Sequence, residues 1–101
     1  MADFVKVGKK DDVPAGSGKT FEVNGKPIAV FNVEGNFYAV HDTCLHRGGP
    51  LGEGDVEGKI VTCPWHGWQY DVTNGVNEMD PSMILEKFEV KVEGDDLLVA
   101  A

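Results

Sequence analysis

Apolar and polar residues alternate along much of the chain with the two-residue period of β-strands. The clearest case is residues 86–93, where Phe88, Val90 and Val92 fall on one face and Glu89, Lys91 and Glu93 on the other. Similar short runs occupy residues 4–7, 20–23, 26–33, 37–41, 59–62, 68–71 and 97–100. No stretch has a convincing helical period beyond a possible turn near Ile84. The pattern predicts an all-β fold of small antiparallel sheets.

Turn signals separate these runs. Asn24-Gly25 lies between two of them and favours a type I′ hairpin, because both residues tolerate positive φ. Residues 34–36, Asn74-Gly75 and residues 94–96 mark further turns. We therefore expect a meander of antiparallel strands that leads directly into Cys44.

One segment, residues 15–20, reads AGSGKT and resembles the end of a phosphate-binding loop. The full pattern needs glycine at position 13, where this chain has Val13. No helix-forming run follows, so no helix N-terminus is available to hold phosphate. We expect a loop that does not bind nucleotide.

Composition narrows the functional classes. The 101 residues suit one domain, residues 1–101. The N-terminal residues contain no export signal and no apolar run is long enough to span a membrane, so we expect a cytoplasmic protein. The formal charge of −8 argues against nucleic acid and anionic membranes as partners. It permits docking to basic surfaces of other proteins.

The candidate chemistry lies in two short clusters, Cys44-x-His46 and Cys63-x-x-His66, which are sixteen residues apart. Thiolate and neutral imidazole are ligands for zinc and iron rather than for calcium or magnesium. Glycines and prolines around both clusters allow the sharp turns that would bring the ligands together: Gly48, Gly49, Pro50 and Gly67. The four residues predict one metal site.

Two simpler interpretations compete with this one. A disulfide between Cys44 and Cys63 would leave the histidine spacing unexplained. A structural zinc site is the stronger alternative, although zinc fingers usually pair two cysteines in one loop and two histidines in another. The third histidine, His41, ends a strand-like run and is assigned no role.

The segments CLHRGGPL and CPWHGWQYD together resemble the Rieske iron–sulfur signature. The resemblance covers nearly the whole chain and implies one [2Fe–2S] cluster, with Cys44 and Cys63 on one iron and His46 and His66 on the other. It also implies a sandwich-like base domain, residues 1–41 and 71–101, with an inserted cluster-binding subdomain at about residues 42–70. The segment around Pro81 would shield the cluster from a third side.

The same resemblance bears on the reduction potential. Two imidazoles in place of two thiolates make the cluster less negative, which raises its potential above that of an all-cysteine cluster. High-potential Rieske proteins carry an extra cysteine in each loop and a serine after the last ligand, where this chain has Gly49, Trp65 and Trp68. Tyr70 matches a tyrosine whose hydroxyl can bond a cysteine sulfur. We expect the low end of the range, about −150 to 0 mV.

The chain is too short for a second domain with a mononuclear iron, and it has no flavin or nicotinamide motif. It is similar to the Rieske-type ferredoxins of bacterial aromatic-ring dioxygenases. That resemblance implies a soluble monomeric one-electron carrier, not an enzyme by itself, between an NAD(P)H-dependent ferredoxin reductase and a terminal oxygenase. His46 and His66 would form the exposed edge of the cluster.

Pro50, Trp65 and Pro81 would shape the docking surface beside that edge, although Trp65 could equally be a core aromatic residue. Two other functions remain open. One is the small subunit of an assimilatory nitrite reductase, which shares the fold. The other is a zinc-stabilised interaction module.

Overall fold

A computed structural model describes residues 4–42, 50–65 and 67–100. This part of the chain forms nine β-strands and two single-turn 3₁₀ helices, and it contains no α-helix. The elements are β1 (Phe4–Lys9), η1 (Lys10–Asp12), β2 (Ser17–Val23), β3 (Lys26–Val33), β4 (Asn36–His41), η2 (Leu51–Glu53), β5 (Asp55–Glu57), β6 (Ile60–Thr62), β7 (Gln69–Asp71), β8 (Lys87–Glu93) and β9 (Asp96–Ala100). The all-β prediction is confirmed. Among the described residues, no helix is long and apolar enough to cross a membrane.

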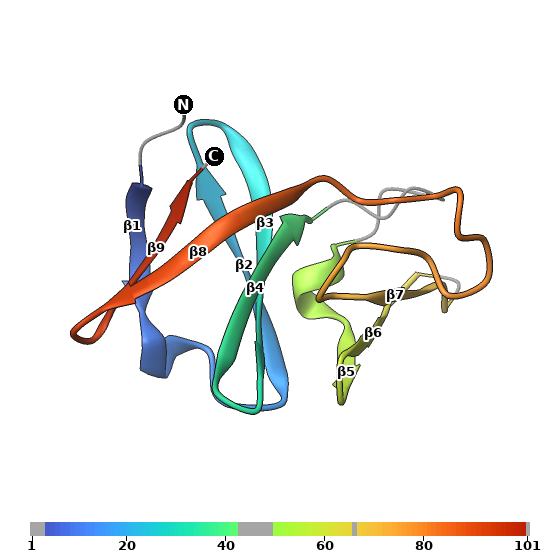
Figure 1. Ribbon diagram of the computed structural model, residues 1–101, viewed down its shortest axis with the longest axis horizontal. Coiled ribbons are helices and arrows are strands. Elements are labelled where there is room, and N and C mark those ends of the chain that lie inside the picture. Colours follow the sequence, from blue (N-terminus) through green and yellow to red (C-terminus); the bar gives the residue numbers. More distant parts are fainter. Residues whose placement is uncertain (1–3, 43–49, 66, 101) are drawn as a thin grey trace.

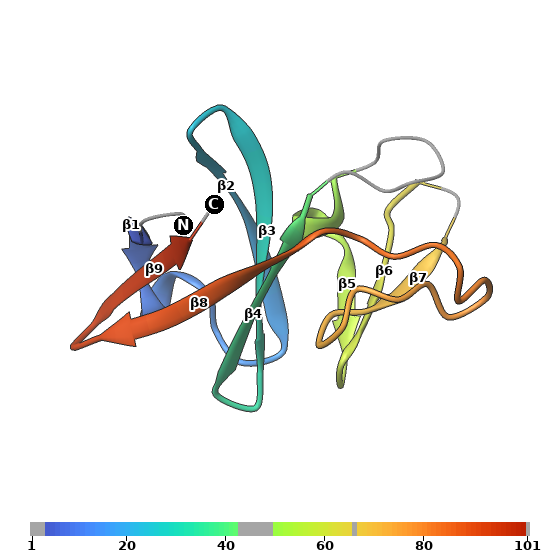
Figure 2. The same ribbon diagram turned by 45° about the horizontal axis from the view of Figure 1, so that its top comes forward.

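Six strands form one antiparallel sheet in the order β1-β9-β8-β4-β3-β2. The sheet curls into a half-barrel that brings its two edge strands, β1 and β2, back into contact (Figure 1). At this seam a Cβ on Gly8 would lie 3.3 Å from the Phe21 ring. A separate sheet, β5-β6-β7, lies beside the half-barrel, as the views in Figures 1 and 2 agree.

The predicted hairpin at Asn24-Gly25 is confirmed. The two residues have φ values of 52° and 81°, and Val23 pairs directly with Lys26. The next turn is tighter than expected, because Asn36 already pairs with Val33 and belongs to β4. Glu34 therefore takes a left-handed φ of 54°, a conformation in which a glutamate side chain is unfavourable.

Two expectations about the strands were wrong. Residues 15–20, expected to form a loop, are mostly strand, since β2 begins at Ser17 and pairs with the far half of β3. Gly18 leaves room there for the Phe31 ring, so the packing partner lies on another strand and leaves no local pattern. The second error is β5, which was not expected because residues 55–57 have only Val56 as an apolar residue.

The described residues form two apolar clusters, one within the large sheet and one that packs the small sheet against it. Inside the half-barrel lie Val13, Val23, Ile28, Val30, Ala39, Leu97 and Val99. Between the sheets lie Ala29, Phe31, Val40, Leu51, Val61, Cys63, Tyr70, Val72 and Leu85. Alternate residues of β3 serve the two clusters, so both faces of this strand are buried. Each fully buried large apolar side chain contributes about 1.5–3 kcal/mol to this packing.

Candidate functional site

Cys63 directly follows β6 and lies where the β6–β7 hairpin turns. Its amide donates to the Trp68 carbonyl oxygen at 2.7 Å, which closes the base of the turn. The residue is 2% exposed, and the Trp65 amide donates to its Sγ at 3.4 Å. A backbone N–H aimed at sulfur favours the thiolate, the form that binds metal. Its burial and donor chemistry fit a cluster ligand.

Cys44, His46 and His66 lie outside the described residues, so their part in the site stays a prediction. The structure does describe the segments just before and just after the loop that contains Cys44 and His46. The Leu51 amide donates to the Asp42 carbonyl oxygen at 2.7 Å. The chain therefore leaves β4 and returns to η2 at the same place.

The Asp42 side chain holds the two segments that flank this loop against the large sheet. Its Oδ1 accepts hydrogen bonds from the Thr20 hydroxyl at 2.9 Å and from the Gly52 amide at 2.7 Å. Burial raises the pKa of the Asp42 carboxyl, while these two hydrogen bonds oppose the rise. The carboxylate thus ties β2, the end of β4 and η2 together. Sequence reasoning missed it, because a lone aspartate after a strand carries no sign that it is buried.

Two glycines bring η2 against its neighbours. A Cβ on Gly52 would lie 2.7 Å from the Thr20 nitrogen, and one on Gly54 would collide with the carbonyl oxygen of Thr62. Both glycines allow the backbone around η2 to approach its neighbours closely, a role that no local sequence pattern indicates. Since Leu51 and Cys63 also share one apolar cluster, the ends of both predicted ligand loops rest on a common base.

The segment between β7 and β8 contains Pro81 and is held along β7 by the Glu78 amide, which donates to the Gln69 carbonyl oxygen at 2.9 Å. Asn77 is 1% exposed, and its side-chain oxygen accepts from the amides of Met79 and Asp80. The hydroxyl and amide of Ser82 lower the pKa of Asp80. These bonds present Met79 and Pro81 to solvent in a fixed turn. Sequence reasoning overlooked Asn77, although a buried amide between two turn residues is typical of such a loop.

Three aromatic residues surround the hairpin turn. Trp65 is half exposed, which favours a surface role over a core role. Trp68 packs against the apolar cluster between the two sheets. Tyr70 is fully buried within that apolar cluster, together with Cys63. The predicted bond between the Tyr70 hydroxyl and a cysteine sulfur stays a prediction.

A family model for the Rieske [2Fe-2S] domain matches residues 3–89. The chain belongs to the Rieske family. One curated Rieske relative, "Biphenyl 2,3-dioxygenase, ferredoxin component" from Rhodococcus jostii (strain RHA1), is 39% identical over 97 residues, which are 95% of this chain and 91% of that protein. The ferredoxin solved as "Complex of reduced oxygenase and oxidized ferredoxin in carbazole 1,9a-dioxygenase" has a TM-score of 0.86 and 33% identity, covering 99% of this chain and 94% of that one.

A solved chain described as the small subunit of a putative NADPH nitrite reductase is also similar. It has a TM-score of 0.82 and 23% identity, and covers 98% of this chain and 99% of that one. At that identity the likeness shows the shared Rieske fold alone.

Membership of the Rieske family confirms several predictions. The fold is the Rieske fold, and the cofactor is a [2Fe–2S] cluster of the type bound by two cysteines and two histidines. The relatives are electron-transfer components, so this protein is an electron-transfer component and not a catalytic subunit. The zinc and disulfide alternatives are set aside.

Proposed function

We propose that Cys44, His46, Cys63 and His66 hold the cluster, and that the protein carries single electrons from an NAD(P)H-dependent reductase to the terminal oxygenase of an aromatic-ring dioxygenase. The observation that carries the proposal is the match over nearly the whole chain to dioxygenase ferredoxins, one of them solved in complex with its oxygenase. The buried sulfur of Cys63 at the hairpin turn supports the ligand assignment.

The bound cluster supplies a centre that accepts and releases one electron. The chain sets how readily it does so. The Trp65 amide draws charge from the Cys63 sulfur, which favours the reduced state, and Tyr70 would add to this effect if its hydroxyl bonds a sulfur. The chain lacks the serine and the pair of extra cysteines of high-potential Rieske proteins, and their absence lowers the reduction potential. We therefore retain a potential of about −150 to 0 mV.

Trp65 connects this site to the molecular surface. Its amide lies at the ligand sulfur, while its indole is 50% exposed. Pro81 is also exposed, and Pro50 is partly exposed at the start of η2. These residues support a docking surface beside His46 and His66, the ligands that we expect at the exposed edge of the cluster.

The proposal includes a monomeric cytoplasmic protein that binds neither membrane nor nucleic acid. It also includes a cluster-binding subdomain at about residues 42–70 within a base made of residues 1–41 and 71–101. The separation of β5-β6-β7 from the six-stranded sheet supports that division. The nitrite reductase alternative ranks lower, because only the fold favours it.

The first experiment is an electron paramagnetic resonance (EPR)-monitored reductive titration of the purified protein. A rhombic signal with average g of about 1.9 and a midpoint in the low range are expected. Alanine at any one of the four ligands should abolish the signal. A midpoint above about +200 mV would contradict the low-potential assignment.

The second experiment mixes the reduced protein anaerobically with the terminal oxygenase of the Rhodococcus jostii biphenyl dioxygenase and follows reoxidation by stopped flow. Reoxidation that depends on oxygenase concentration is expected. A normal EPR signal without electron transfer would contradict the oxygenase assignment and leave the cofactor in place.

A further inference from the structure

The outer face of β5-β6-β7 has an unusual composition. Glu57, Ile60 and Asp71 are paired across the sheet, as are Asp55, Thr62 and Gln69. Residues directly opposite one another, and those two apart on a strand, share a face. All six therefore point one way, while the intervening residues Val56, Val61 and Tyr70 pack toward the core. The outward set contains all three acidic residues of the small sheet, Asp55, Glu57 and Asp71.

This face contains a hollow of about 260 Å³, which we call the outer hollow; it is lined by Glu57, Ile60, Thr62, Gln69 and Glu78. Ile60 supplies the apolar surface within it. Glu78 comes from the segment before β8 and is placed by the bond from its amide to the Gln69 carbonyl oxygen. The Gln69 side-chain nitrogen donates to the Thr62 hydroxyl at 3.2 Å, which orients the polar part of the wall.

The charges of the outer hollow are not neutralised within the described residues. Asp71 is paired with Lys59 at 3.3 Å. Glu57 and Glu78, by contrast, form no ion pair with any described residue, and both are exposed. Asp55 on the same face adds a further exposed carboxylate. The hollow thus combines an apolar patch with two negative walls.

The apolar patch and the two carboxylates together restrict which kind of group can bind in the outer hollow. No group of three or more acidic, histidine or cysteine side chains among the described residues could hold a metal ion, which argues against a bare cation. A second copy of this chain would bring a formal charge of −8 against the carboxylates. A long basic side chain fits both parts, with its aliphatic stem on Ile60 and its charged head between Glu57 and Glu78.

We propose that the outer hollow receives an arginine side chain from the redox partner. A guanidinium has five donors in a planar fork, enough to bond both carboxylates and the Gln69 amide oxygen, whereas an ammonium group has three. The inference rests on the proposed function, because it assumes a protein partner. Thr62 precedes Cys63 and Gln69 follows Trp68, so an arginine bound here anchors the partner at the base of the ligand hairpin.

The test titrates the ¹⁵N-labelled holoprotein with acetyl-Ala-Arg-Ala-amide at low ionic strength. Saturable shifts of the Glu57, Ile60 and Glu78 amides are expected. The Glu57→Gln/Glu78→Gln protein should bind about tenfold more weakly, because two charge-assisted contacts are lost. The citrulline analogue of the peptide, which has the same shape without the charge, should bind neither protein measurably.

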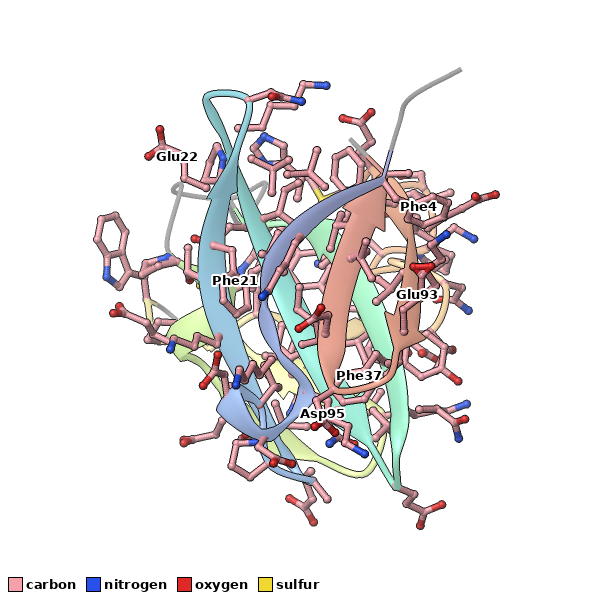
Figure 3. The ribbon with its side chains drawn as sticks, turned by 90° about the vertical axis from the view of Figure 1, so that its left-hand side faces the viewer. Phe4, Phe21, Glu22, Phe37, Glu93 and Asp95 are labelled. Atoms are coloured by element: carbon pink, nitrogen blue, oxygen red, sulfur yellow. The ribbon has the colours of Figure 1, made fainter. Side chains whose placement is uncertain are left out.

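Glu22→Gln/Glu89→Gln is the matched control, since it removes two exposed carboxylates from the large sheet (Glu22 in Figure 3). This variant should bind the peptide as the unmodified protein does. Equal weakening in both variants, equal binding of citrulline, or no saturable shift at these amides would each overturn the proposal.

A parallel stopped-flow measurement separates this inference from the proposed function. Glu57→Gln/Glu78→Gln should keep its EPR signal and midpoint potential while reducing the oxygenase about tenfold more slowly at low ionic strength. Electron transfer at an unchanged rate in this variant would contradict the outer hollow alone. Peptide binding without any electron transfer to the oxygenase would contradict the oxygenase assignment and the partner role of the hollow, but not the hollow's preference for arginine.

Discussion

Asp71, at the end of β7, is a carboxylate that is only 5% exposed and is almost completely engaged. Its Oδ1 accepts from the Thr73 amide at 2.9 Å and from the Thr73 hydroxyl, and its Oδ2 pairs with Lys59. Burial acts to raise the pKa of Asp71, but the bonds from Thr73 and Lys59 outweigh it, and the pKa falls below its usual value. The folded state therefore prefers the ionised form.

Asp71→Asn should lower stability at neutral pH by about 1–2 kcal/mol. Because the folded pKa lies below the unfolded value of about 3.9, the contribution of the charge is complete above that pH and is lost as the pH falls through the folded pKa. The difference in melting temperature between the two proteins should stay constant from pH 7 to about pH 5 and shrink below about pH 4. Asp55→Asn, at an exposed site on the same face, should show little difference at any pH.

Trp65 gives a second prediction for a single residue. Trp65→Ala removes a half-exposed indole but keeps the backbone amide that donates to the Cys63 sulfur. The EPR signal and the midpoint potential should be unchanged, while the second-order rate of oxygenase reduction should fall about tenfold or more, as for a central aromatic contact. Loss of the cluster would instead show that the indole supports the loop. Trp65→Phe is the control and should keep most of the rate.

At the scale of elements, Gly54 controls how closely η2 approaches the ligand hairpin. A Cβ there would collide with the Thr62 carbonyl oxygen, one residue before Cys63, and also lie 3.0 Å from Val61. Gly54→Ala should push β6 away and reduce the iron bound per protein, measured by iron assay and visible absorbance. Gly58→Ala, in the β5–β6 turn, is the control, because a Cβ there has no atom within 4 Å. It should lower stability only through the backbone strain of a φ of 60°, by roughly 1 kcal/mol. A variant at Gly54 with full iron content would contradict this role.

The same elements show what sequence could and could not predict. The β2–β3 hairpin, β8 and the turn that carries Cys63 follow from local signals, namely Asn-Gly, strict alternation and ligand spacing. Asp42, Gly18 and Gly54 act through partners eight or more residues away, in Thr20, Phe31 and Thr62. Nothing near these residues in sequence shows that Asp42 links distant segments by hydrogen bonds, or that Gly18 and Gly54 allow close packing. The metal ligands could be predicted from the sequence because few residue types bind iron or zinc. The packing that supports these ligands depends on the completed fold and could not.

At the scale of the whole molecule, the charge is unevenly distributed. Residues 42–86 contain eight acidic and two basic residues, a net −6, while the remaining residues contain nine and seven, a net −2. These values add to the total of −8. Most of the net negative charge thus lies on the part of the chain that carries the ligand motifs and the outer hollow. Such a distribution would orient this part of the molecule toward a basic partner before contact.

Steering of this kind predicts a specific dependence on salt. The second-order rate of electron transfer to the oxygenase should fall steeply as ionic strength rises, because the screening length shortens to about 10 Å at 0.1 M. Once the complex has formed, the first-order transfer step should change little, since screening acts mainly on separated charges. Glu53→Gln/Asp55→Gln should flatten the salt dependence more than Glu22→Gln/Glu89→Gln, although both remove two charges. A rate that is independent of salt, or an equal effect of the two variants, would show that the uneven charge does not guide association.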